Sequence, residues 1–179
     1  MADVAQAFID QSRRFLRDEY LGKIEQCVGE LSKDDLWWRP NEVSNSVGNL
    51  LLHLAGNVRQ WIIHGVGGAE DTRQRQQEFD ERNGGAAGLL LARLRETLSE
   101  ADRVLAGLTP EDLVEPRRIQ GIDVTVLEAI YHVVEHFSTH VGQIIYVTKL
   151  RTGRDLRFYE MNADGSVRRG WLSAPVEDN

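Results

Sequence analysis

Apolar residues recur every three or four positions along most of the chain, which is the period of a helix with one buried face. Four segments show this pattern, residues 4–31, 47–62, 91–108 and 123–150. Pro40 and Asn41 separate the first two, and Ser44 and Ser46 are suitable N-caps for the second. No segment alternates apolar and polar residues over several positions. The pattern therefore predicts an all-α four-helix bundle without strands.

The connections differ in length and composition. Residues 70–83 are polar, lack apolar periodicity and end at Gly84-Gly85, so we expect a long loop or mobile connection between the second and third helices. This length also permits a topology other than up-down-up-down. Gly153 is expected to end the fourth helix. Residues 1–153 would then form the bundle, and residues 154–179 a C-terminal tail or extension.

Two short segments resemble each other. Residues 31–36 (LSKDDL) and 108–113 (LTPEDL) each follow a long helix and precede a histidine-bearing one. Two helical hairpins related by a pseudo-twofold axis would explain this weak repeat.

Composition narrows the classes of partner and location. The 179 residues carry a net charge of −7 and no basic stripe, which argues against binding to nucleic acid or anionic membrane. The single cysteine, Cys27, falls on the apolar stripe of its helix and is expected to be buried. No secretory signal and no apolar run of membrane-spanning length is visible, so we expect a soluble, cytoplasmic protein.

Three histidines suggest a metal site. His136 and His140 are four residues apart, which places them on one helix face with Cβ atoms about 6 Å apart, within reach of a common ion. His53 from the second helix would complete a triad and leave a coordination position for water or substrate. His64 lies three turns beyond His53, roughly 16 Å along the helix axis, and cannot share the ion.

Other polar residues on these helices are candidates for contacts to the ligands or to substrate. They are Asn57, Glu135, Gln143 and His132. Glu135 precedes His136, so the motif lacks the glutamate of HExxH, and Glu135 projects about 100° away from it. A helical histidine is more often a surface or hydrogen-bonded side chain than a ligand, so a structural role for the histidines stays open.

Two further groups have alternative interpretations. Trp37 and Trp38 could contact a ligand or a subunit, although adjacent aromatic residues after a helix more often close a hydrophobic core, which we favour. Arg117 and Arg118 could bind an anion. Nothing in the sequence places them near the histidines.

The two histidine-bearing runs also carry a family resemblance. Residues 46–57 (SVGNLLLHLAGN) and 135–143 (EHFSTHVGQ), with the helix order, resemble the DinB-like superfamily, which includes the YfiT-like four-helix bundles. The likeness spans about Val4 to Leu150. It implies that His53, His136 and His140 bind a divalent metal, commonly zinc or nickel, and that the protein is a homodimer.

The resemblance also indicates a class of activity. Characterised relatives are largely thiol-dependent transferases or isomerases, so we expect metal-dependent S-transferase-type chemistry on a small-molecule substrate, with a low-molecular-weight thiol as a further cofactor. A metal-dependent hydrolase would share the same first step. A non-catalytic dimeric bundle for ligand or protein interaction, with structural or adventitious metal, is the alternative from another class, and whether the chain is an enzyme stays open.

Overall fold

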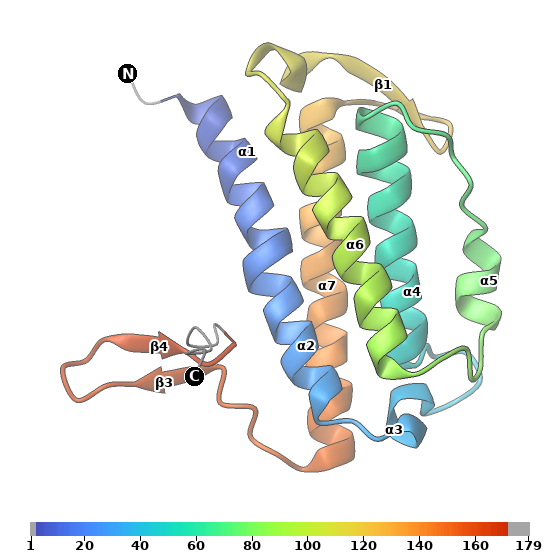
Figure 1. Cartoon of the computed structure of the whole chain (residues 1–179), viewed down its shortest axis with the longest axis vertical. Helices are drawn as coiled ribbons and strands as arrows, with labels where there is room; N and C mark the ends of the chain where they lie inside the picture. The colour runs from blue at the N-terminus through green and yellow to red at the C-terminus, as the bar shows by residue number, and fades with distance from the viewer. Residues whose placement is uncertain (1–2, 172–179) are drawn as a thin grey trace, which may run out of the picture.

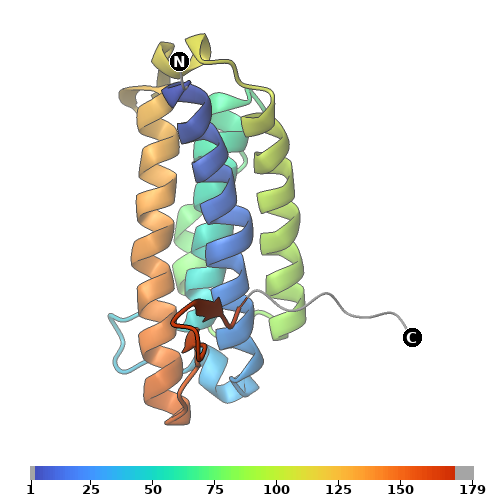
Figure 2. The same ribbon diagram turned by 90° about the vertical axis from the view of Figure 1, so that its left-hand side faces the viewer.

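The structure is a computed structural model that describes residues 3–171, and four long helical segments lie side by side in it (Figures 1 and 2). The first is continuous through α1 (Val4–Arg14), the π-helical η1 (Phe15–Tyr20) and α2 (Leu21–Gly29). The second joins α4 (Val47–Val58) to the π-helical η2 (Arg59–Val66), and the others are α6 (Ala87–Ala106) and α7 (Val126–Thr152). The protein is predominantly helical, as its periodicity predicts.

The direction of the chain differs from up-down-up-down. In Figure 1 the first segment runs downward, α4 and α6 both run upward, and α7 runs downward again. Residues 67–86 make the return crossing between α4 and α6. Helix α4 packs against α6 and α7, whereas α1 and α2 pack on the other side of the same two helices. The antiparallel neighbours α4 and α7 carry the three histidines of interest.

The predicted apolar faces form one core. On α7, Ile130, Phe137 and Ile144 are completely buried, and Leu54 of α4 faces the same interior. Cys27 is also fully buried, as expected, and burial raises the pKa of its thiol to about 11. This thiol is therefore part of the core and not a nucleophile.

Side-chain caps fix the starts of the two histidine-bearing helices. Ser46 and Asn49 form a reciprocal capping box at the start of α4, and Thr125 and Glu128 form another at the start of α7. At the other end of α7, Gly153 adopts a left-handed conformation (φ 65°), which glycine takes without steric cost.

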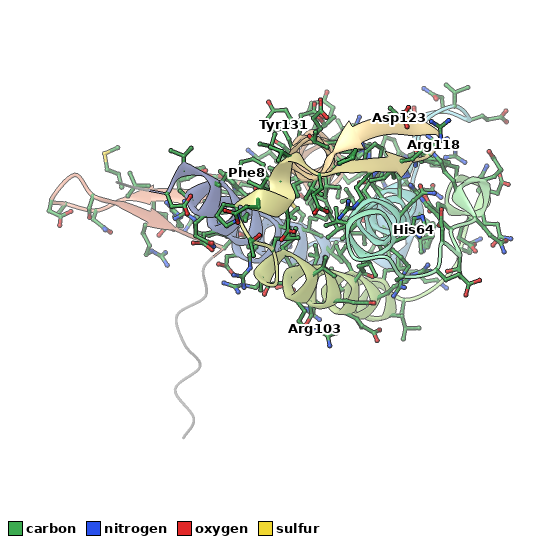
Figure 3. All side chains as sticks on the ribbon, turned by 90° about the horizontal axis from the view of Figure 1, so that it is seen from above. Phe8, His64, Arg103, Arg118, Asp123 and Tyr131 are labelled. Carbon is green, nitrogen blue, oxygen red and sulfur yellow. The ribbon has the colours of Figure 1, made fainter. Side chains whose placement is uncertain are left out.

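The prediction of a chain without strands was wrong. Two antiparallel hairpins are present, β1 (Pro116–Ile119) with β2 (Ile122–Thr125) and β3 (Tyr159–Met161) with β4 (Val167–Arg169). Each strand has three or four residues, too few for alternation to emerge from the sequence. Because β2 continues to Thr125, α7 begins at Val126 and not at the predicted residue 123. Figure 3 shows this first hairpin from above, with Arg118 and Asp123 on its two strands.

The polar connection is more ordered than predicted. It contains a short helix, α5 (Arg75–Asp80), beside α4 (Figure 1). The buried amide of Asn49 donates hydrogen bonds to the backbone oxygens of Glu78 and Glu81, each at 2.9 Å. The buried amide of Asn49 and the two backbone oxygens of the connection therefore satisfy each other, and the connection is held against the helix that carries His53.

The two similar short segments both form a helical turn. Residues Lys33–Trp37 make α3 and residues Glu111–Val114 make the 3₁₀ turn η3. Trp37 is buried and donates from its indole nitrogen to the backbone oxygen of Gly85, which agrees with a core role. Trp38 is only half-buried and lines a surface cavity, so the core prediction was wrong for this second tryptophan.

The segment after α7 packs on the first helical segment. Leu156 and Trp171 are 3% and 6% exposed, and Lys23 of α2 lies 4.2 Å from the Trp171 ring centroid. Gln26 donates a hydrogen bond to the backbone oxygen of Leu156. Residues 154–171 therefore form an extension that covers part of α2. Across residues 3–171, every helix is too short or too polar to cross a membrane.

Candidate metal centre

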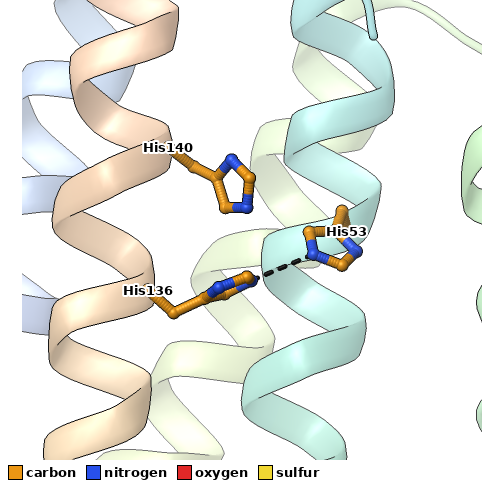
Figure 4. A group of neighbouring side chains, drawn as sticks. All are labelled: His53, His136 and His140. Carbon is orange, nitrogen blue, oxygen red and sulfur yellow. Dashed lines mark hydrogen bonds between the residues drawn. The ribbon is translucent and has the colours of Figure 1, made fainter. Parts of the chain in front are cut away.

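Three histidines from α4 and α7 converge on one point. His53 projects from α4, while His136 and His140 project from successive turns of α7 (Figure 4). Each offers one ring nitrogen, and these three atoms lie within 4.8 Å of one another. His53 is 4% exposed, and the other two are half-buried. The structure thus brings together the three residues that the helical spacing singles out.

The orientation of His53 is fixed by an ion pair on its outer side. Its Nδ1 lies 3.0 Å from Glu78 Oε2 and 3.2 Å from Arg73 Nη2. Arg73 already donates to both carboxylate oxygens of Glu78, at 2.7 and 2.8 Å. Because the carboxylate can only accept, the proton belongs on His53 Nδ1 and is donated to Glu78. The Nε2 lone pair of His53 therefore faces the other histidines.

A similar contact orients His140. Its Nδ1 lies 2.7 Å from Gln143 Oε1, so Nδ1 carries the proton and the amide oxygen accepts it. The Nε2 atom is thereby left as the acceptor. His136 Nε2 lies 2.9 Å from His53 Nε2 (dashed in Figure 4), and since His53 Nε2 must accept, His136 donates this hydrogen bond.

The histidines of α7 favour their neutral forms. Burial lowers the pKa of His136, aided by repulsion from His140 and His53, to about 3. Burial likewise lowers the pKa of His132 and of His140. A neutral imidazole keeps a lone pair at neutral pH, which is the state that binds a metal cation.

Glu78 stays ionised although it is buried. Burial acts to raise the pKa of its carboxyl group, but hydrogen bonds from Arg73 and His53 outweigh burial and hold the pKa below its ordinary value. The Arg73 side chain is 2% exposed and also donates to Gln60. Arginine, carboxylate and imidazole thus form a satisfied buried network.

Gly56 makes room for this network. A Cβ atom on Gly56 would lie 2.0 Å from Glu78 Oε1 and 2.9 Å from Arg73 Nε. Glycine is therefore required one turn after His53 for the ion pair to approach the helix. Sequence reasoning missed Arg73 and Glu78 because they belong to a polar segment without periodicity. Their only signal was a carboxylate and a guanidinium five residues apart in a connection of unusual length.

The other candidate residues take different positions. His132 stacks between Trp61 and His136, with ring centroids 4.0 and 5.5 Å away, respectively. Glu135 is exposed and contributes only electrostatically, opposing the fall in the pKa of His132 and of His140. Asn57 is 3% exposed, and its buried Oδ1 accepts no hydrogen bond from the described residues.

His64 and the arginine pair lie elsewhere. His64 belongs to η2, where Nδ1 contacts the backbone oxygen of Ala69. The η2 segment forms the upper end of the second helical segment in Figure 1, and Figure 3 labels His64 on it. Arg117 pairs with Glu115 and Arg118 with Asp123 on the exposed hairpin. These residues serve local contacts and do not join the three histidines.

The donor set fits a divalent transition metal. Three imidazole nitrogens are typical of zinc, nickel, copper or iron sites, and an outer hydrogen-bond acceptor on the ring opposite the metal is typical of histidine ligands. His53 and His140 each have such an acceptor, in Glu78 and Gln143. Three protein ligands leave at least one position open, which distinguishes a reactive centre from a closed structural one.

Comparison with known proteins assigns a family but no activity. No curated protein matches the chain. Residues 3–163, which include all three histidines and the Arg73–Glu78 pair, match a family described as protein of unknown function (DUF1572). This match covers most of the 179 residues and extends past the end of α7 into the C-terminal extension. The chain therefore belongs to the DUF1572 family.

Proposed function

We propose that this protein binds a divalent metal, zinc or nickel, through His53, His136 and His140, and uses it in catalysis. The observation that carries the proposal is the convergence of three ring nitrogens within 4.8 Å, two of them with the opposite nitrogen held by Glu78 or Gln143. We also propose that the four helical segments are a four-helix bundle of the DinB-like type. The resemblance of residues 46–57 and 135–143 supports this assignment.

The residues of the chain prepare this site in two ways. Glu78 and Gln143 fix the tautomers of His53 and His140, so that both present Nε2 inward. His136 must move its proton to Nδ1 when its Nε2 becomes a ligand, which exchanges the hydrogen bond to His53 for coordination. A bound divalent metal would lower the pKa of a coordinated water or thiol and supply hydroxide or thiolate near neutral pH.

We favour thiol transfer over hydrolysis, with the thiol supplied from outside the chain. Cys27 is buried and has a raised pKa, so it supplies no thiolate. A low-molecular-weight thiol at the open position would attack an electrophilic small molecule. The preference for a thiol over water rests on the family resemblance. A homodimer likewise stays a prediction of that resemblance.

Metal content tests the first step. Tag-free protein should contain close to one equivalent of metal by elemental mass spectrometry, and His53→Ala and His136→Ala should each abolish it. His64→Ala is the matched control, because His64 lies in the same helical segment as His53 but outside the triad. Wild-type protein that is metal-free and cannot be reloaded would remove the case for this class of enzyme.

A competition assay separates the two reactions. Metal-loaded protein would be mixed with an electrophilic aromatic probe in the presence and absence of a low-molecular-weight thiol. Transfer predicts consumption that depends on the thiol and is lost in His140→Ala. Equal consumption without thiol would favour the hydrolase, and no consumption by stoichiometrically loaded protein would favour a binding role.

A further inference from the structure

A surface cavity lies next to Gln143, and the proposed function does not use it. It has a volume of about 510 Å³, which is within the usual range for small-molecule sites. Its walls come from α4, α7 and the connection between α3 and α4. The residues that line it are Trp38, Pro40, Val43, Ser44, Asn45, Leu50, Gln143, Tyr146, Val147 and Leu150.

The cavity adjoins the candidate metal centre. Gln143 lines it and also accepts the hydrogen bond from His140 Nδ1. Leu50 lines it from α4, three residues before His53. Three residues correspond to roughly 4.5 Å along a helix, so on both helices the cavity reaches to within one turn of the ligands.

The chemistry of the walls is uncharged. Seven of the ten lining side chains are aromatic or aliphatic, and the polar ones are a hydroxyl and two amides, from Ser44, Asn45 and Gln143. Tyr146 and Leu150 are 69% and 58% exposed, so this cavity presents large apolar side chains to solvent. The lining side chains can bind an apolar body but themselves give no ion-pair partner to a charged one, and the nearby Arg151 is already paired with Asp35.

The walls are also held in place before any ligand binds. Arg39 donates to the backbone oxygens of Ser44 and Glu42, which ties the loop that forms one wall. Arg151 pairs with Asp35 and stacks over the Trp38 ring at 4.7 Å, which fixes the indole at the rim. Little rearrangement is then needed on binding.

We infer that this cavity is the substrate pocket of the proposed metal centre and that it takes an uncharged small molecule with an aromatic or aliphatic body. The inference rests on the proposed function for the reaction, but the binding of such a molecule stands on the cavity alone. The apolar body of the substrate would lie between Trp38 and Tyr146, and its reactive end would extend past Gln143, which is on the side of His140 away from the metal, toward the open position of the triad.

Binding is tested with three probes that share one body. They are 4-methylbenzyl alcohol, 4-methylbenzoate and 4-methylbenzylammonium, followed by ligand-observed NMR on the full chain as purified and after chelator treatment. The neutral alcohol should bind in both preparations, and at least about tenfold more tightly than either ion. Equal binding of all three, or no binding of the alcohol at millimolar concentration, would overturn the inference.

Paired substitutions on α7 locate the site. Tyr146→Ala should weaken binding of the alcohol about threefold to tenfold, and Leu150→Asp should weaken it by more than about tenfold. Tyr131→Ala and Leu127→Asp are the controls, because these side chains are also exposed on α7 but do not line the cavity. Thermal unfolding checks that each variant folds. Equal losses in the control variants would contradict the assignment.

Loading with a paramagnetic ion tests the link to the metal. Co²⁺-loaded protein should broaden the proton signals of the bound alcohol, and Zn²⁺-loaded protein should not. If the alcohol binds as predicted but the protein takes up no Co²⁺ and the alcohol signals are not broadened, the binding pocket is supported and the metal proposal fails. If Co²⁺ loads stoichiometrically and the bound alcohol is not broadened, the pocket is separate from the centre and the inference is overturned.

Discussion

Substituting Gln143 tests how the orientation of His140 affects metal binding without removing His140 itself. It is exposed, and its contact with the triad is the hydrogen bond that its amide oxygen accepts from His140. Gln143→Leu should lower metal affinity about tenfold to 100-fold without changing the unfolding temperature of the metal-free protein, because the imidazole loses its fixed tautomer. Chelator competition measures this affinity.

Two variants control this prediction. Gln143→Glu keeps an acceptor at the same place and should retain affinity. Glu135→Gln changes an exposed side chain of the same helix that makes no hydrogen bond to the three histidines and acts on His140 only through its charge, so it should change the affinity less than Gln143→Leu does. A loss of affinity in Glu135→Gln as large as that in Gln143→Leu would show that general electrostatics on α7, and not the tautomer, controls binding.

The titration of His136 predicts how metal-free protein responds to acid. Its folded-state pKa of about 3 lies below the ordinary 6.5, so the unfolded chain binds more protons between these values. The contribution of neutral His136 to the free energy of unfolding is fully present above pH 6.5. It falls as the pH drops below this value, with a slope of up to about 1.4 kcal/mol per pH unit for each such histidine. The carboxyl group of Glu78, whose pKa is also lowered, takes up a proton only in more acidic solution, and the stability that it contributes is lost there.

Chemical unfolding of chelator-treated protein between pH 7.5 and 5 measures this slope. His136→Phe removes the titrating group from the same half-buried position and should unfold with a shallower dependence on pH. An identical slope in the variant would show that His136 is not the group that couples acid to unfolding.

At the scale of elements, α4 and the polar connection depend on each other through Gly56. Gly56→Ala should destabilise the fold by about 1–3 kcal/mol and weaken metal binding, because the new methyl group must displace Glu78 and Arg73. Gly142→Ala is the matched change on α7, where nothing lies within 4 Å of the added atom. It should instead stabilise by about 0.5–1 kcal/mol through helix propensity.

Thermal and urea unfolding compare the two alanine variants, and chelator competition reports metal affinity. Gly56→Ala with unchanged affinity would mean that the ion pair can move without disturbing His53. That result would show that Glu78 is not needed for metal binding, and it would leave the role of the three histidines unaffected.

Helical periodicity explains why part of the site could be predicted from sequence. His136 and His140 share a face because they lie one turn apart, and the apolar stripes of α4 and α7 indicate which faces meet. Arg73 and Glu78 follow no such period. Their position depends on hydrogen bonds from Asn49 to backbone oxygens about 30 residues away, and long-range pairing of this kind leaves no local signature.

The same reasoning applies to the hairpins and to Trp38. Strands of three or four residues are set by backbone pairing and by a turn at Gln120 and Gly121, both with positive φ, and not by an apolar pattern. Trp38 follows a buried tryptophan in sequence, but α3 ends at Trp37 and Trp38 has an extended backbone (ψ 143°), so adjacency in sequence does not bring both rings into the core.

At the scale of the whole molecule, the candidate metal site lies between helices that the hydrophobic core already packs together. A metal bound by His53 of α4 and by His136 and His140 of α7 would link two antiparallel segments, and the Arg73–Glu78 pair would extend the link to the return connection. Ligation to the folded state alone must stabilise that state by mass action. Metal binding at the proposed centre would thus be coupled to the stability of the whole fold.

Metal loading should therefore raise the unfolding temperature of the full chain. At a free Zn²⁺ or Ni²⁺ concentration 100 times the dissociation constant, the gain is about 2.7 kcal/mol, or roughly 5–10 °C for a chain of this length. Scanning calorimetry of chelator-treated protein with and without metal measures it. His140→Ala should lose the increment, His64→Ala should keep it, and Mg²⁺, which prefers oxygen ligands, should not produce it. An increment that persists in His140→Ala would place the stabilising metal elsewhere on the protein, since removing one of three ligands must weaken a site built from all three.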